Sequence, residues 1–292
     1  MKKYPLLISI ILLLSIPFGL SAQTTGPASG ALFIHGGGRV NFGEFVALVK
    51  STTGKSDPVI RVITTPQGPR RIQPLKNGEV FPVVSGLRKQ YRLSDVQELF
   101  TLSPKDGNDP NFYGHIDGAD AVYMTGGNQS FLTDAFLNTE TLAALHRLLD
   151  RGGVIGGGSA GAQVQSSFMT RGDYKRRVIL GDKKHQIGFG FVTNSAFDVH
   201  VEERNRENDL YQVFKARKRQ LQERDLDPNQ LLGIGIDQGT AAIVVKNELR
   251  VSGGGLVRIF DPQQWNKDRK PFYLELEDGD TFDLESRQQL ND

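Results

Sequence analysis

The chain has 292 residues, a formal net charge of +2 and no cysteine. The absence of cysteine excludes disulfides and thiolate chemistry, and the length suits one large domain with an ample core. Lys2 and Lys3 account for the whole excess of positive charge, and the neutral remainder argues against nucleic acid as a partner.

Residues 1–22 are predicted to form a secretory signal peptide. Lys2 and Lys3 precede an apolar run that ends in a small-residue cleavage pattern at Ala22, and the run is short for a bilayer span. We therefore expect cleavage after Ala22 and a single α/β domain over residues 23–292. The protein is then exported, to the periplasm or the outside of the cell, with no membrane attachment once the signal is removed.

Short apolar strands alternate with amphipathic helices through the first half of the chain. Strands are expected at residues 31–34, 59–64 and 121–124, and helices at 42–49 and 132–149. This alternation indicates a parallel sheet, in which ligands bind beyond the carboxyl ends of the strands. Three Gly-rich turns follow such strand ends, after Ile34, Met124 and Ile155.

The third of these turns contains Gly157-Gly158-Ser159-Ala160-Gly161, which fits G-x-S-x-G. A strand, a tight turn and a helix form the context of a nucleophile elbow, where small neighbours let the serine adopt a strained conformation. The alternative is a Gly-rich turn that binds phosphate or only reverses the chain. The other Gly-rich strand ends favour the elbow.

His200 is the candidate base among five histidines. The alternation in residues 196–201 predicts a strand that places Asp198 and His200 on the same face. Arg204 and Arg206 follow, so the segment has the composition of a polar site.

A second interpretation is an α/β-hydrolase esterase, because His35-Gly-Gly-Gly precedes the G-x-S-x-G motif. That fold requires the order serine, acid, histidine, with the histidine late in the chain. No histidine follows His200, so the order disfavours the esterase.

Four motifs in this order resemble the cyanophycinase branch of the S51 serine peptidases. They are Thr125-Gly-Gly-Asn-Gln129, Gly157-Gly-Ser-Ala-Gly-Ala162, Asp198-x-His200 with Arg204-x-Arg206, and Gly233-Ile-Gly-Ile-Asp-Gln238. The resemblance implies a flavodoxin-like fold related to the class I glutamine amidotransferases, with a mostly parallel sheet and helices on both faces. It also implies hydrolysis of cyanophycin, a poly-aspartate that carries arginine on its β-carboxyls, to β-Asp-Arg dipeptides, without a metal or an organic cofactor. A sister branch cleaves α-Asp-X dipeptides.

The resemblance also implies roles for individual residues. Ser159 corresponds to the nucleophile and His200 to the general base, and the backbone N–H groups of Gly127 and Ala160 correspond to the oxyanion hole. The positions that match the family's substrate site are Gln129, Asp198, Arg204 and Arg206.

Two departures bear on the function. Gln238 stands where the family has glutamate as the third triad member; an amide can orient an imidazole but cannot stabilise its positive charge. Asp173 is an alternative orienter and Asp182 a weaker one. Asp209 stands where the cyanophycinases carry a further arginine, which leaves recognition of the polymer open.

We therefore predict a serine-type peptidase acting on a peptide or a cyanophycin-like polymer. The alternatives are an aspartyl or isoaspartyl dipeptidase of the same family and a catalytically weakened member that only binds such chains; a homodimer is left open. At the C-terminal end, paired strands are expected within residues 231–245, with a turn at Gly239. A β-hairpin is expected around Asp278-Gly279.

Overall fold

The computed structural model describes residues 24–175, 178–216, 221, 226–227, 229–264 and 273–290. The predicted signal peptide, residues 1–22, lies outside them. Within the described ranges, no helix combines the length and apolar character needed to cross a bilayer.

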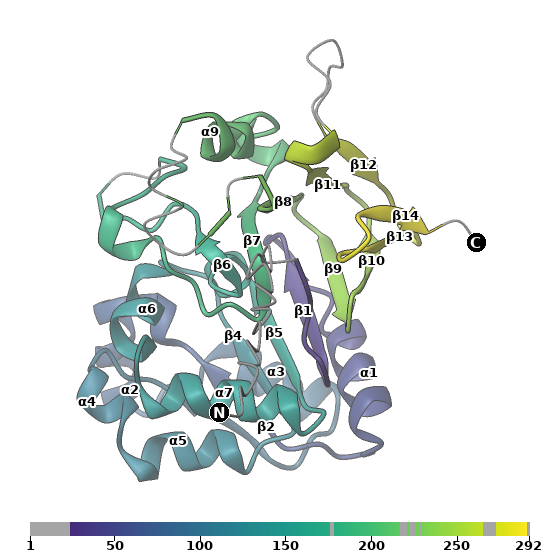
Figure 1. Cartoon of the computed structure of the whole chain (residues 1–292). Helices are drawn as coiled ribbons and strands as arrows, with labels where there is room; N and C mark the ends of the chain where they lie inside the picture. Colours follow the sequence, from purple (N-terminus) through teal and green to yellow (C-terminus); the bar gives the residue numbers. More distant parts are fainter. Residues whose placement is uncertain are drawn as a thin grey trace, which may run out of the picture.

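The core of the molecule is a nine-stranded sheet in which five neighbouring strands are parallel (Figure 1). The parallel strands, in spatial order, are β1 (Ala31–His35), β5 (Val154–Gly158), β4 (Ala121–Met124), β2 (Ile60–Ile63) and β3 (Val96–Leu99). Beyond β1 the sheet continues with antiparallel strands: β9 (Thr240–Val245), β10 (Glu248–Gly253), β13 (Thr281–Asp283) and β14 (Gln288–Leu290).

Helices cover both faces of this sheet, as the flavodoxin-like prediction requires. On one face α1 (Phe42–Thr53) and α3 (Pro82–Gln90) bury Phe45 and Leu87 against strand residues such as Phe33. On the other face lie α5 (Pro110–Asp117), α6 (Ser130–Phe136) and α7 (Glu140–Asp150). The remaining short helices are η1 (Thr65–Arg71), α2 (Ile72–Lys76), α4 (Pro104–Gly107), α8 (Ala160–Gln163), η2 (Lys183–His185), η3 (Glu202–Arg204) and η4 (Pro262–Gln264).

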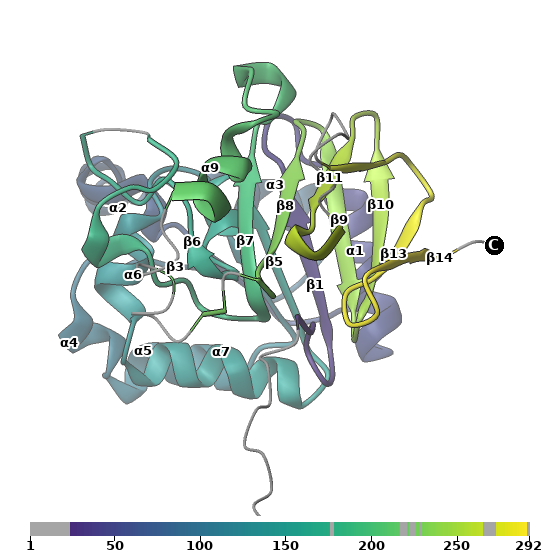
Figure 2. The same ribbon diagram turned by 45° about the horizontal axis from the view of Figure 1, so that its top comes forward.

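A second sheet of five strands packs against the α6 and α7 side of the first (Figure 2). It contains β12 (Leu274–Leu276), β11 (Val257–Phe260), β8 (Leu232–Ile236), β7 (Val192–Val199) and β6 (Ser166–Met169). Strands β6, β7 and β8 are parallel, and α9 (Asp209–Ala216) covers their outer face through Val213 and Phe214. The carboxyl ends of β5 and β7 thereby meet where the two sheets adjoin.

The predicted strand pairings near the C-terminus are wrong, although the strands themselves are present. Strands β8 and β9 flank Gly239 but belong to different sheets, because β8 pairs with β7 and β11 whereas β9 pairs with β1 and β10. Likewise the Asp278-Gly279 turn joins β12 and β13 of different sheets. The C-terminal hairpin is formed instead by β13 and β14, with Thr281 opposite Leu290.

Two local predictions also need correction. The helix expected over residues 132–149 is divided into α6 and α7 because Asn138 adopts a left-handed φ of 58° that a helix cannot contain. The strand expected to include His200 ends at Val199, and His200 itself has a φ of 55°. The side chains of Asp198 and His200 are therefore not related by simple strand alternation.

Candidate active site

Ser159 lies between β5 and α8 in a conformation that L-residues rarely adopt, with φ of 55° and ψ of −111°. Its N–H donates to the carbonyl oxygen of His35 on the neighbouring strand at 3.0 Å. Glycines make this turn possible: a methyl group at Gly161 would lie 2.2 Å from the carbonyl oxygen of Met124. Such strain costs about 1–3 kcal/mol and persists at functional sites, where it projects a side chain toward a ligand.

The Ser159 hydroxyl is 2.8 Å from Nε2 of His200, which is hydrogen-bonding distance. His200 follows β7, and its backbone N–H donates to the carbonyl oxygen of Gly36 at 3.0 Å. The imidazole packs on Gly37, where a methyl group would lie 2.1 Å from Cε1 of the ring. The loop after β1 thus holds the base against the hydroxyl, an arrangement that can activate serine as a nucleophile.

The two proposed oxyanion donors lie beside Ser159. The Gly126-Gly127 turn after β4 approaches it closely, since a methyl group at Gly126 would lie 3.4 Å from the Ser159 Cβ. Gly127 has a φ of 141° and no room for a side chain against Pro66. Ala160 opens α8, and the first N–H groups of a helix have no acceptor within that helix. Both N–H groups can therefore serve an oxyanion that forms at Ser159.

A cavity of about 260 Å³ opens on the Ser159–His200 pair. The sequence-predicted residues that line it are Gly127, Gln129, Ser159, Asp173, His200, Arg204 and Arg206; the others are Asn128, Gln163 and Arg171. Asn128 lies within the Thr125–Gln129 motif but was given no role, and no motif or periodicity singles out Gln163 or Arg171. Asn128 and Gln163 could have been proposed from their places one and four residues from predicted site positions.

Asp198 is fully buried and holds arginine rather than lining the cavity. Both of its carboxylate oxygens accept from Arg171, at 2.7 Å from Nε and 2.6 Å from Nη2. Burial opposes the charge of Arg171, but Asp198 and Asp209 outweigh it and raise its pKa above the ordinary value. Asp198 thus fixes a cation at the cavity wall.

Arg206 is the second buried cation of the cavity. Its Nη1 donates to the Val199 carbonyl oxygen at 3.0 Å and lies 3.6 Å from Asp198 Oδ1. Burial lowers the pKa of Arg206 to about 10, so it stays protonated at neutral pH. Gln129 is also buried and donates from Nε2 to the carbonyl oxygen of Thr170 at 2.8 Å. The cavity is therefore suited to an anionic group.

Gln238 lies against the loop after β1. A methyl group at Gly38 would meet its Oε1 at 2.7 Å, and Gly38 follows the glycine that packs on the His200 ring. Asp173 lines the cavity, and its Oδ1 accepts from the backbone N–H of Lys175 at 2.6 Å. Asp182 caps η2 instead, accepting from Lys184 N–H.

His35 is buried at the end of β1, where its Nδ1 accepts from the Gly37 N–H at 3.0 Å. Burial lowers the pKa of His35 to about 4. The ring is thus neutral in the folded protein at pH 5–7, and its role is to brace the loop that carries Gly37.

The pH dependence of stability should report this histidine. Because the folded pKa lies below that of an unfolded histidine, about 6.5, the stabilisation is full above pH 6.5 and falls as the pH drops toward 4. At pH 5 we expect a loss of about 2 kcal/mol relative to pH 7. Urea unfolding of the parent and of His35→Asn, which keeps an acceptor for the Gly37 N–H, measures this loss. If the free energies of unfolding of the two proteins change with pH in parallel, the explanation by His35 is contradicted.

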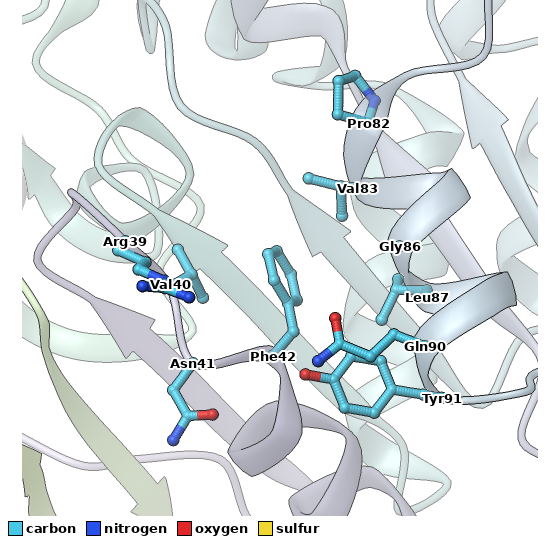
Figure 3. A pocket seen from close by; sticks show the side chains of 10 residues that line it. All are labelled: Arg39, Val40, Asn41, Phe42, Pro82, Val83, Gly86, Leu87, Gln90 and Tyr91. Atoms are coloured by element: carbon cyan, nitrogen blue, oxygen red, sulfur yellow. The ribbon is translucent and has the colours of Figure 1, made fainter.

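A larger cavity, of about 470 Å³, lies between the start of α1 and α3 (Figure 3). Phe42 projects into its centre, with Val83 and Leu87 on one side and Val40 on the other. Its lining holds no serine, histidine or carboxylate, so the chemistry belongs to the smaller cavity at Ser159.

Comparison with known proteins agrees with this geometry. The model of peptidase family S51 matches residues 95–251, which include Ser159 and His200. A cyanophycinase of Geminocystis herdmanii is 28% identical over 193 residues, 62% of this chain. That match spans 66% of the relative, just under two thirds of its length. The crystal structure of a peptidase from an acI-B1 actinobacterium superposes with a TM-score of 0.62 at 20% identity, over 90% of this chain and 98% of that one, and supports the fold. The chain belongs to peptidase family S51.

Proposed function

We propose that this protein is an exported serine-type peptidase that cleaves cyanophycin at β-Asp-Arg units through an acyl-enzyme on Ser159. The observation that carries the proposal is the 2.8 Å contact between Ser159 Oγ and His200 Nε2 beside a cavity with buried arginines. The similarity to a cyanophycinase supports the choice of substrate.

The chemistry follows from the placement of these groups. His200 takes the proton of Ser159 as the hydroxyl oxygen attacks the scissile carbonyl, and the N–H groups of Gly127 and Ala160 stabilise the resulting oxyanion. Collapse of the tetrahedral intermediate expels the amine, which receives the proton from His200. A water molecule then attacks the acyl-enzyme while His200 takes its proton. His200 returns this proton to the Ser159 oxygen as the acyl group leaves.

The substrate is held by charge. Arg206 is buried at the cavity wall and Arg204 is exposed at its mouth. Guanidinium groups bind carboxylates in two-point contacts, so these residues can hold a free carboxylate of an aspartyl unit or of the arginine attached to it.

Export is part of the proposal and rests on the signal-peptide pattern of residues 1–22; the position of Thr24 is compatible with its cleavage. This residue is buried, and its hydroxyl donates to the Asn194 carbonyl oxygen at 3.1 Å and accepts from Arg287 Nη2 at 3.1 Å. Cleavage after Ala22 would leave this anchor intact. N-terminal sequencing of the protein recovered from outside the cytoplasm tests it; a start at Met1 contradicts it.

The substrate is tested by incubating the purified protein with insoluble cyanophycin and following the release of dipeptides. Dipeptide release from the polymer supports the proposal. Parallel assays with α-Asp and β-Asp dipeptides test the second candidate, an aspartyl or isoaspartyl dipeptidase, which the small cavity of about 260 Å³ favours. Cleavage of dipeptides alone would reject the polymer as substrate.

Changing Gln238 to glutamate should raise kcat/KM by about tenfold, equivalent to about 1.4 kcal/mol of transition-state stabilisation. The reason is that Gln238 stands at the family's third triad position, where a carboxylate would stabilise the imidazolium that forms during attack. Gln90→Glu makes the same change at the larger cavity and should leave the rate unaltered. A loss of activity in Gln238→Glu would mean that the amide serves another purpose, such as holding substrate.

A further inference from the structure

Arg171 is shared between two carboxylates at the wall of the active-site cavity. Its side chain is 7% exposed and its Nη2 contacts Asp198 Oδ2 at 2.6 Å and Asp209 Oδ2 at 2.5 Å. Asp198 is fully buried and already accepts from both Nε and Nη2 of Arg171. Asp209 therefore adds a second negative charge to a cation that Asp198 alone would hold in place.

Asp209 reaches this position from another element. It is the first residue of α9, its side chain is 28% exposed, and its Oδ1 accepts from Gln212 Nε2 at 3.1 Å. Asp209 can therefore be substituted without disturbing the core. Its carboxylate connects α9 to Arg171 at the cavity wall.

The charges around the cavity show what this bridge does. The cations that line the cavity are Arg171, Arg204 and Arg206. Asp198 and Asp209 both act on Arg171, and Asp198 also lies 3.6 Å from Arg206. Without Asp209 the net charge around the cavity would be more positive by one. The site is partly shielded from water, where charges interact more strongly.

We propose that Asp209 is a specificity-determining residue: the negative charge that it adds beside Arg171 disfavours substrate groups with more than one carboxylate. It acts through Arg171 and does not need to touch the substrate. This inference rests on the proposed aspartyl-peptide function for the choice of ligand, and it concerns how the cavity distinguishes anions of different charge.

The test compares two small anions on the Ser159→Ala protein, so that binding is measured without turnover. N-acetyl-L-asparagine carries one carboxylate and N-acetyl-L-aspartate carries two. In Asp209→Asn we expect the first to bind about threefold and the second about tenfold more tightly, because each ligand charge then meets one negative charge fewer at the cavity wall. Titration followed by NMR gives both dissociation constants, and the gain should shrink as salt is added.

Three variants keep the result interpretable. Asp209→Glu restores the charge and should bind both anions like the parent, and Gln212→Ala removes the hydrogen bond to Asp209 without changing charge and should do the same. Asp209→Ser supplies a second uncharged variant that suits a helix start. Equal gains for the two anions, or none, in folded Asp209→Asn and Asp209→Ser would overturn the inference.

Activity assays separate this inference from the proposed function. If the parent cleaves no aspartyl peptide while the two anions respond to Asp209→Asn as expected, the inference stands and the proposed function fails. If the parent cleaves aspartyl peptides but the ratio of the two affinities is unchanged, the function stands and the inference fails.

Discussion

Replacing either Ser159 or His200 with alanine should lower kcat by at least about 10⁴-fold, with neither change unfolding the protein. The two side chains form one functional unit through the 2.8 Å contact, because the hydroxyl is a poor nucleophile without the base and the base has no proton to take without the hydroxyl. The double variant should therefore be no slower than the slower single variant.

Steady-state kinetics on a cleaved aspartyl peptide, with circular dichroism to verify folding, measure these effects. A suitable control is His146→Ala, because this histidine lies on α7 and contacts the Phe189 carbonyl oxygen rather than the cavity. Losses that multiply in the double variant would show that Ser159 and His200 act independently, against this account.

The second large effect is expected from Gly37→Ala, although Gly37 has no functional group. Its φ is 105°, and an added methyl group would lie 2.1 Å from Cε1 and 2.7 Å from Nε2 of His200. The ring must move to make room, and a displacement of about 1 Å at a reacting group can cost about 100-fold in rate. We expect kcat/KM to fall by about 100-fold or more.

Gly54→Ala separates this steric effect from backbone strain. Gly54 also has a positive φ, of 70°, but an added methyl group meets nothing within 4 Å. Gly54→Ala should lose only the stability that backbone strain costs and keep full activity, while Gly37→Ala should lose activity. Full activity in Gly37→Ala would mean that the loop yields and that it does not position the base.

The parallel part of the fold was predictable because local signals agree there. Strand β4 coincides with its predicted range, β1 extends one residue beyond its range, and β2 is one residue shorter than its range at each end. The second sheet was not predicted, since β8 is buried along its whole length and lacks the alternation that would indicate its neighbours. For the same reason, the sequence predicts that the two strands flanking Gly239 pair with each other, although they belong to different sheets.

Only the residues of the candidate site that lie in sequence motifs could be predicted. The elbow places Ser159, and the Asp-x-His pattern identifies His200, although a left-handed φ rather than strand alternation sets its direction. Arg171 could not be found, because it follows β6 in a loop and reaches the cavity only through the packing of the second sheet. The burial of Asp198 also depends on that ion pair.

The most direct test of a serine nucleophile is covalent labelling by a fluorophosphonate, followed by mass spectrometry of the modified peptide. The account predicts one adduct, on Ser159, that is absent in Ser159→Ala and forms far more slowly in His200→Ala, where the base is missing. Gln238→Glu should label faster than the parent. Labelling that persists unchanged in Ser159→Ala, or that maps to another residue, would contradict the account.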